Sequence, residues 1–417
     1  MLRISLALLT LAAFAAPPAV AHDHRDKTLR FATFNASVNR NAAGQLLTDL
    51  QTGTDQQLRN VAEIIQRARP DVLLVNEFDF YADQQAARLF QRNYLSVSQH
   101  GAKPIEFPFR FVKPSNTGIA SGKDLDNDGQ VVTTPGTGAY GNDSFGFGEF
   151  PGKFGLAVFS RLPIDYRKAR TFQLFKWKDM PGALLPDNPA TPGVAQDWYS
   201  PDELDIFRLS SKSHWDVPIV VGRGEEVHFL VSHPTPPVFD GPEDRNGTRN
   251  HDEIRFWADY IDPAASGYIY DDDGHRGGLK RGEHFVIAAD MNADPLDGDS
   301  TQGAIQQLLD NPRINTSVTP TSPGGPEQSA LQDQINSTHK GNPAFDTADF
   351  ADTSPGNLRA DYVLPDRFTK IKSSFVFWPL STDPLFPLVG TYAGLPNGNG
   401  FPSSDHRLVA VDFALEH

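Results

Sequence analysis

One stretch of the sequence, Glu283 to Pro295, constrains the fold more than any other. Phe285 to Ala289 carry no charge, which is typical of a short strand buried on both faces of a sheet. Asp290 follows where this strand leaves the sheet, and Asn292 lies two residues further on, so strand alternation places both side chains on one side. Asp294-Pro295 ends the run, because proline cannot continue a strand ladder. Two interpretations follow: a rim that holds reacting groups, or a strand followed by an ordinary turn.

The same pattern, a polar and metal-capable residue at the end of an apolar run, recurs along the chain. Any one of these positions has an ordinary explanation, such as a turn former or a surface histidine. Their repetition at six separated places favours a shared site at one edge of the sheets. The positions are Asn35, Glu77, His233, Asp290 with Asn292, Asp361, and Asp405 with His406.

Alternating and helical spacings of apolar residues predict a layered protein of strands and helices. We expect strands at 29–38, 71–75, 154–160, 217–221, 226–232, 285–289, 360–364, 374–378 and 407–413, and helices at 56–69, 83–91, 251–261 and 303–309. Two long insertions interrupt this pattern, near 96–152 and 311–357, and the second is expected to be a surface excursion. Because neither an internal repeat nor a linker is evident, residues 22–417 are expected to form a single domain.

The first residues predict export. Arg3 precedes an apolar run at 4–16, and Ala19-Val20-Ala21 is a small-residue cleavage site, so residues 1–21 are expected to be a signal peptide. That run is too short to favour a transmembrane helix, and no later stretch is long and apolar enough. The absence of cysteine excludes disulfides and thiol chemistry. We therefore expect a secreted or periplasmic monomer without a transmembrane segment.

The polar motifs, taken in order, resemble those of the endonuclease/exonuclease/phosphatase superfamily, whose fold is similar to that of pancreatic deoxyribonuclease. The resemblance runs from about Leu29 to Phe413. Two positions depart from the family pattern, because Asn76 stands where members usually have Gln, and Ala289 where they usually have Gly. The motifs stand here as Thr33-Phe34-Asn35, Asn76-Glu77, Gly155 to Ile164, Ser232-His233, Ala289 to Pro295, Asp361-Tyr362-Val363 and Ser404-Asp405-His406.

This resemblance implies an α/β fold, a four-layered α/β sandwich of two packed mixed sheets flanked by helices, with the site at one rim. It also implies a metal. Phosphoester hydrolysis requires that a developing negative charge be neutralised and a water aligned, and a divalent ion held by oxygen ligands suits that task. The implied ligands of Mg²⁺ or Mn²⁺ are Glu77, Asn35 and Asp405.

The resemblance assigns the remaining motif residues to catalysis. Asp290 would orient or deprotonate the attacking water, and Asn292 would position that water and the phosphate. His406 would contact the phosphate with Asp361 as its carboxylate partner. His233 would stabilise the transition state or protonate the leaving oxygen, and which histidine acts as the acid stays open.

Two further stretches predict binding. Asp124, Asp126 and Asp128 lie in a D-x-D-x-D-G sequence, the start of a calcium loop, although Pro135 stands where such a loop needs Glu. They either hold a structural Ca²⁺ or form a solvated acidic turn. Arg245, Arg249 and His251 follow closely after His233 and either reach the substrate phosphate or belong to an exposed charge run that feeds a helix.

These observations favour a secreted, divalent-metal-dependent phosphoesterase that hydrolyses phosphodiester or phosphomonoester bonds. A net charge of −15 and the lack of a basic stripe do not favour nucleic acid as the partner, although an extracellular nuclease stays an alternative. Insertions rich in phenylalanine favour a small or lipid-like substrate. A calcium-dependent binding module on a catalytically retired scaffold is the alternative from another class, and the presence of every implied catalytic residue argues against it.

Overall fold

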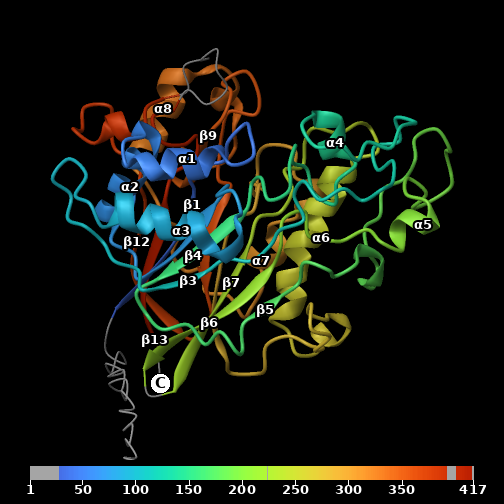
Figure 1. Ribbon diagram of the computed structural model, residues 1–417, viewed down its shortest axis with the longest axis horizontal. Coiled ribbons are helices and arrows are strands. Elements are labelled where there is room, and N and C mark those ends of the chain that lie inside the picture. Colours follow the sequence, from blue (N-terminus) through green and yellow to red (C-terminus); the bar gives the residue numbers. More distant parts are fainter. Residues whose placement is uncertain (1–27, 223, 392–400, 416–417) are drawn as a thin grey trace, which may run out of the picture.

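The computed structural model describes residues 28–222, 224–391 and 401–415, so the predicted signal peptide lies outside the described residues. Two large sheets pack face to face, and helices cover their outer faces (Figure 1). The fold is therefore the four-layered α/β sandwich expected from the sequence. Among the described residues, no helix combines the length and the apolar character needed to cross a membrane.

The first sheet has six strands in the order β12-β13-β1-β2-β4-β3. β1 pairs antiparallel with β13 and parallel with β2, so segments from both ends of the chain meet in the middle of this sheet. The strands are β12 (Thr369–Val376), β13 (Val409–Leu415), β1 (Leu29–Asn35), β2 (Val72–Asn76), β4 (Leu156–Ser160) and β3 (Phe109–Phe111).

The second sheet has five strands in the order β11-β8-β7-β6-β5. β6 and β7 pair antiparallel along their length, β7 and β8 run parallel, and β8 pairs antiparallel with β11. A small third sheet joins β9 (Ala348–Asp349) to β10 (Asn357–Leu358). The strands of the second sheet are β11 (Asp361–Pro365), β8 (His284–Asp290), β7 (Glu225–Ser232), β6 (Trp215–Gly222) and β5 (Arg170–Thr171).

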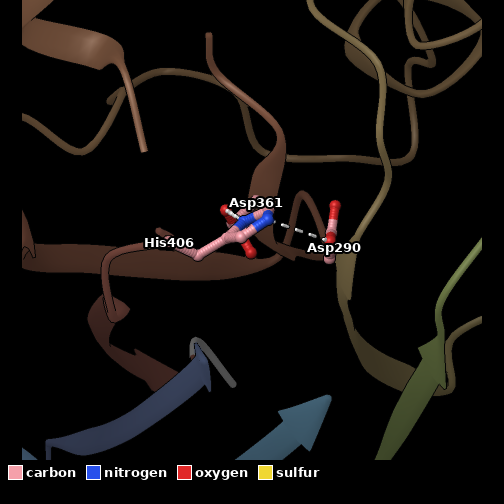
Figure 2. Close-up of side chains that lie close together, drawn as sticks. All are labelled: Asp290, Asp361 and His406. Carbon is pink, nitrogen blue, oxygen red and sulfur yellow. Dashed lines mark hydrogen bonds and ion pairs between the residues drawn. The ribbon is translucent and has the colours of Figure 1, made fainter. Parts of the chain in front are cut away.

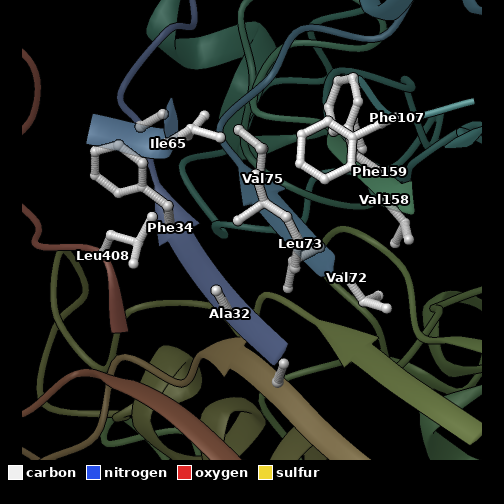
Figure 3. Packing of buried hydrophobic residues seen from close by; sticks show 14 of the residues in the cluster. Ala32, Phe34, Ile65, Val72, Leu73, Val75, Phe107, Val158, Phe159 and Leu408 are labelled. Atoms are coloured by element: carbon white, nitrogen blue, oxygen red, sulfur yellow. The ribbon is translucent and has the colours of Figure 1, made fainter. Parts of the chain in front are cut away.

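Helices α1 to α3 cover the first sheet, and α6 covers the second (Figure 1). Phe34 and Val75 on the first sheet lie in one apolar cluster with Ile65 of α2 (Figure 3). The α-helices are α1 (Gln45–Thr52), α2 (Gln56–Ala68), α3 (Gln85–Phe90), α4 (Gly138–Asn142), α5 (Pro201–Leu204), α6 (Arg245–Tyr260), α7 (Gln306–Leu309) and α8 (Gly324–Gln332).

Strand alternation decides which side chains face the opposite sheet. On β8, Val286 and Ala288 belong to the core between the sheets, whereas Phe285 and Ile287 pack in the cluster on the α6 side. The core between the sheets is closed by contacts such as that of Phe31 with Phe229, whose ring centroids are 5.3 Å apart. Positions that continue these inward-facing series past the last apolar residue therefore meet at the rim between the two sheets.

Three predicted elements differ from the structure. The helix expected at 251–261 begins at Arg245, because its first turns are polar but buried, and an apolar spacing does not detect them. The strand expected at 374–378 runs instead from Thr369 to Val376, since it is an edge strand with few apolar residues. The excursion at 311–357 is not confined to the surface: Thr347 to Asp349 are fully buried.

A buried histidine next to α6 makes the stability of this fold sensitive to acid. Ser210 Oγ donates to Nδ1 of His214 at 2.6 Å, and Nε2 of His214 donates to the carbonyl oxygen of Glu253 at 2.8 Å. Burial lowers the pKa of His214 from 6.5 to about 4. Between these two values the unfolded chain binds a proton that the folded chain does not, so the free energy of unfolding falls as the pH is lowered through this window.

We expect this contribution to fall by roughly 3 kcal/mol between pH 7.5 and pH 4, at about 1.4 kcal/mol per pKa unit. Urea unfolding of the wild type and of His214→Gln across this range checks it. The stability difference between the two proteins should be largest at pH 7.5 and should shrink as the pH falls. A difference that does not change with pH would mean that His214 does not titrate as described.

Candidate active site

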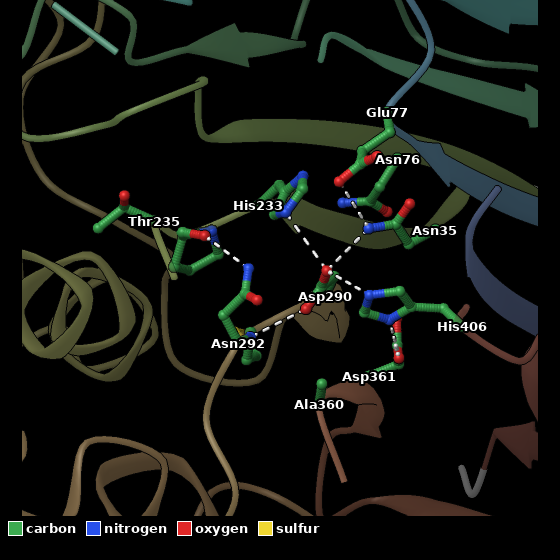
Figure 4. A network of polar contacts seen from close by, with 12 residues as sticks. Asn35, Asn76, Glu77, His233, Thr235, Asp290, Asn292, Ala360, Asp361 and His406 are labelled. Carbon is green, nitrogen blue, oxygen red and sulfur yellow. Dashed lines mark hydrogen bonds and ion pairs between the residues drawn. The ribbon is translucent and has the colours of Figure 1, made fainter. Parts of the chain in front are cut away.

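The polar residues predicted at six separate strand ends meet at one rim of the sandwich (Figure 4). Asn35 is the last residue of β1 in the first sheet, and Asp290 is the last residue of β8 in the second sheet. Both main sheets therefore contribute a polar side chain to the site. Asp361 begins β11 and is the register partner of Asp290. Asn35, Asp290 and Asp361 come to the same place because their positions continue the inward-facing series of the buried strands.

The carboxylate of Asp290 is the centre of this cluster and is 1 % exposed. Its Oδ2 lies 2.9 Å from the amide nitrogen of Asn35, 3.3 Å from Nε2 of His233 and 3.6 Å from Nε2 of His406. Its Oδ1 accepts the backbone N–H of Asn292 at 2.9 Å. Burial alone would raise the pKa of Asp290, but His406 and His233 together lower it well below its ordinary value. Asp290 is therefore ionised at neutral pH.

His406 and Asp361 form a buried dyad beside Asp290 (Figure 2). Nδ1 of His406 lies 2.8 Å from Oδ2 of Asp361. Burial opposes a charge on His406, but the carboxylates of Asp361 and Asp290 outweigh it and raise its pKa well above the ordinary value. We conclude that His406 is an imidazolium at neutral pH, with its second N–H directed toward Asp290.

His233 has the opposite electrostatic character. Burial, helped by the nearby ammonium of Lys212, lowers the pKa of His233 to about 4 despite its contact with Asp290. Its Nδ1 is buried and has no hydrogen-bond partner among the described residues. The sequence could not distinguish the two histidines, whereas their surroundings make one a cation and the other a neutral imidazole.

Two carboxylates, those of Glu77 and Asp405, form an acidic corner of the site. Burial in the pocket and the charge of Asp405 raise the pKa of Glu77 to about 7. In the described part of the chain neither carboxylate forms an ion pair with Lys, Arg or His. A pair of hard oxygen donors that repel each other and have no direct ion pair fits a divalent ion.

The side-chain amide of Asn35 contacts the acidic corner through its nitrogen, not through its oxygen. Its Nδ2 donates to Glu77 at 3.1 Å and to Asp290 at 2.9 Å, while its Oδ1 accepts the backbone N–H of Ser37 at 3.1 Å. The backbone donor fixes the orientation of the amide. In this arrangement Asn35 bridges the acidic corner and Asp290, and its expected role as a metal ligand stays a prediction.

The site opens into a pocket of about 940 Å³. Glu77, His233, Asp290 and His406 line one part of it. The remaining wall is largely apolar, with contributions from both insertions and from the loop after His233, and includes Leu125, Phe147, Pro236, Val238, Phe239, Phe350 and Leu358. Phe239 is 86 % exposed at the pocket, so this wall continues to the protein surface.

The structure separates the three residues predicted to bind the substrate phosphate. Arg245 and Arg249, one helical turn apart on α6, line the pocket. The guanidinium of Arg249 is already bound by the carbonyl oxygens of Leu209, Phe145 and Arg208. His251 is not among the pocket-lining residues and contacts Asp252, because two residues beyond Arg249 is a rotation of roughly 200° around the helix.

The three aspartates of the calcium-like sequence converge on one another but do not line the pocket. One oxygen from each of Asp124, Asp126 and Asp128 lies within 4.8 Å of the others. Asp124 already accepts the backbone N–H groups of Asp128 and Gly129, as a turn without an ion would. A structural Ca²⁺ at this loop stays a prediction.

Sequence reasoning missed the part of the site that comes from the 311–357 excursion. Oγ1 of Thr347 donates to Oδ2 of Asp361 at 2.8 Å and accepts the backbone N–H groups of Ala360 and Asp361. The ring of Phe350 packs edge-on against His406 at a centroid distance of 5.2 Å. No motif marks either residue, because each acts through a contact with a residue outside the excursion.

A four-layered sandwich with a carboxylate and histidine cluster at its rim defines a phosphoesterase- or nuclease-like fold. The sequence profile of the Endonuclease/Exonuclease/phosphatase family matches residues 32–406, and the chain belongs to that family. Members of this family are generally hydrolases that act on phosphoesters, and they commonly use divalent metals. Among curated proteins, no sequence matches the chain.

Three solved structures that resemble the chain share little sequence with it. An endonuclease/exonuclease/phosphatase from Beutenbergia cavernae is 16% identical, with 93% of this chain and 72% of that chain covered and a TM-score of 0.47. Sphingomyelinase C from Streptomyces griseocarneus is 13% identical, with coverages of 92% and 99% and a TM-score of 0.43. A mannosyl-6-phosphatase from Bacteroides thetaiotaomicron is 14% identical, with coverages of 92% and 99% and a TM-score of 0.41.

The hydroxyl of Thr347 should matter for turnover. We expect Thr347→Val to lower kcat/KM for phosphoester hydrolysis by about tenfold or more, because Asp361 loses a donor and no longer holds His406 in one orientation. Thr347→Ser keeps the hydroxyl and is the matched control. Steady-state kinetics and thermal unfolding of both variants check this. Equal activity of the two variants would show that the hydroxyl plays no part.

Proposed function

We propose that this chain is a secreted or periplasmic phosphoesterase that depends on a divalent metal and hydrolyses a small or lipid-like phosphodiester or phosphomonoester. One observation carries the proposal: an ionised Asp290, two histidines of opposite character and an acidic corner line the same pocket, whose other wall is largely apolar. Acid, base and metal functions for one hydrolytic reaction are thereby within reach of one phosphate.

The metal assignment rests on the chemistry of the acidic corner. Glu77 and Asp405 would hold Mg²⁺ or Mn²⁺, with Asn35 adjacent, because hard carboxylate oxygens suit these ions. When bound, the ion would neutralise charge on the phosphate and its leaving oxygen. Asn35 keeps Glu77 and Asp290 at a fixed separation through its two hydrogen bonds.

The remaining catalytic roles are assigned to side chains of the protein. Asp290 is ionised, its Oδ1 accepts the backbone N–H of Asn292, and its Oδ2 faces Asn35 and both histidines. We assign this fixed carboxylate to orienting the attacking water and accepting its proton. His406, a cation fixed by Asp361, donates a hydrogen bond to the phosphate. His233 is neutral in the free protein, so it stabilises the transition state as a hydrogen-bond donor and is not preloaded as an acid.

The pocket supports a substrate that joins a phosphate to an apolar group. Its wall next to the catalytic residues includes Phe147, Phe239, Phe350 and Leu358, which suit an acyl, alkyl or aromatic moiety better than a polyanion. The net charge of −15 argues in the same direction, against DNA. A nuclease and a retired binding module are the outcomes against which this proposal is tested.

Metal removal and a substrate panel test the proposal directly. We expect release of product from a chromogenic phosphodiester or phosphomonoester, loss of that activity in EDTA, and recovery with Mg²⁺ or Mn²⁺. Glu77→Gln should need a higher metal concentration for half-maximal activity. Linear and supercoiled DNA are assayed in parallel. Activity on DNA alone would establish the nuclease, and no metal-dependent release from any substrate would favour the binding module.

Asp290 should be the most sensitive residue of the site. Asp290→Ala is expected to lower kcat by several orders of magnitude, because it removes the carboxylate that orients the water and that faces both histidines. Asp294→Asn, four residues along the same loop, is the control for local disturbance. Single-turnover kinetics of the purified proteins measure the difference, and near-normal turnover by Asp290→Ala would refute the assignment.

A further inference from the structure

A lysine without a partner lies in the wall of the active-site pocket. Lys212 is 7 % exposed and lines the pocket together with Glu77, His233 and Asp290. Within the described residues its ammonium makes no hydrogen bond and no ion pair, although the charges of Glu253, Glu77 and Asp290 act on it from a distance. No family motif recognised in the sequence contains this residue.

The backbone around Lys212 is fixed on both sides. The carbonyl oxygen of Lys212 accepts the N–H of Asn116 at 2.7 Å, and the N–H of Ser211 donates to Glu253 at 2.6 Å. The other carboxylate oxygen of Glu253 accepts the N–H of Thr235 at 2.7 Å. Glu253 is therefore occupied as a backbone acceptor, and it holds the segment in place without pairing with the ammonium.

The two arginines at this pocket are already engaged by other groups of the protein. The guanidinium of Arg249 donates to three carbonyl oxygens, and that of Arg245 pairs with Glu243. Lys212 alone among these three keeps all of its N–H groups free. The side chain of Lys212 is largely buried, yet its unpaired ammonium faces the pocket, so its presence here points to an anion that occupies the pocket during function.

We propose that Lys212 is a substrate-binding residue, whose ammonium donates hydrogen bonds to a non-bridging phosphate oxygen while that phosphate faces Asp290. The inference rests on the proposed function, because it assigns a role at the same site. It adds a protein cation to the pocket that His233 and the acidic corner of Glu77 and Asp405 also line. Lysine suits this role because it recognises phosphate as a compact charge.

Lys212→Met is the informative variant, since it keeps the length of the side chain and removes the charge. We expect kcat/KM for the phosphoester substrate to fall by about a hundredfold or more. Inorganic phosphate titrated calorimetrically in Mg²⁺ buffer should bind at least tenfold more weakly to the variant. Its melting temperature should stay the same or rise, because the variant removes an unpaired buried charge.

Lys153→Met is the matched control, because Lys153 is also buried but pairs with Glu149. We expect it to retain phosphate binding and to lose thermal stability. Unchanged phosphate affinity in Lys212→Met, or a fall in its melting temperature like that of the control, would overturn the inference. Phosphate binding that depends on Lys212 in a protein without phosphoesterase activity would support the inference and refute the proposed function. No phosphate binding by the wild type would overturn the inference.

Discussion

The burial of one carboxylate between two sheets organises this site. Asp290 belongs to the second sheet, yet Asn35, which donates to it, ends a strand of the first. The two histidines reach it from the loops after β7 and before β13. A buried charge of this kind is tolerated only when it is hydrogen-bonded or paired, so the sheets must pack in the one arrangement that brings these donors together. The geometry of the site therefore depends on the same packing of the two sheets that forms the apolar core.

The two long insertions add residues to the active site and to the wall of its pocket. The strands supply groups at fixed positions, whereas the excursion at 311–357 supplies Thr347, which contacts Asp361, and Phe350, which contacts His406. Arg407, fully buried, pairs with Asp349 at 3.0 Å and so fastens this excursion beside the loop that carries His406. The 96–152 insertion contributes Leu125 and Phe147 to the pocket wall. The strands and the turns next to them thus carry the catalytic groups, and the long insertions shape the pocket in front of those groups.

The sequence was informative where local pattern decides structure. Buried strands ending in polar residues are visible as apolar runs, so the placement of Asp290, Glu77 and His233 at a rim could be predicted from the sequence alone. The first turns of α6 were not predicted, because their buried residues are polar and are held by neighbouring loops. Lys212 and Thr347 were not predicted as site residues for the same reason, because only their surroundings in three dimensions distinguish them. Differences in charge between His233 and His406 likewise depend on burial and neighbours that lie far away in sequence.

The two departures from the family pattern fall on opposite faces of their strands, and this separates their consequences. Asn76 faces inward, and its Nδ2 donates at 3.1 Å to the carbonyl oxygen of Ser232, the residue before His233. It therefore ties the first sheet to the second directly beneath the site, where a longer side chain would have to be accommodated between packed strands. Ala289 faces the α6 side and is fully buried there, so its methyl group fills that core and does not approach the reacting groups. The position of His233 relative to Asp290 thus depends on Asn76, whereas Ala289 affects only the packing behind the strand.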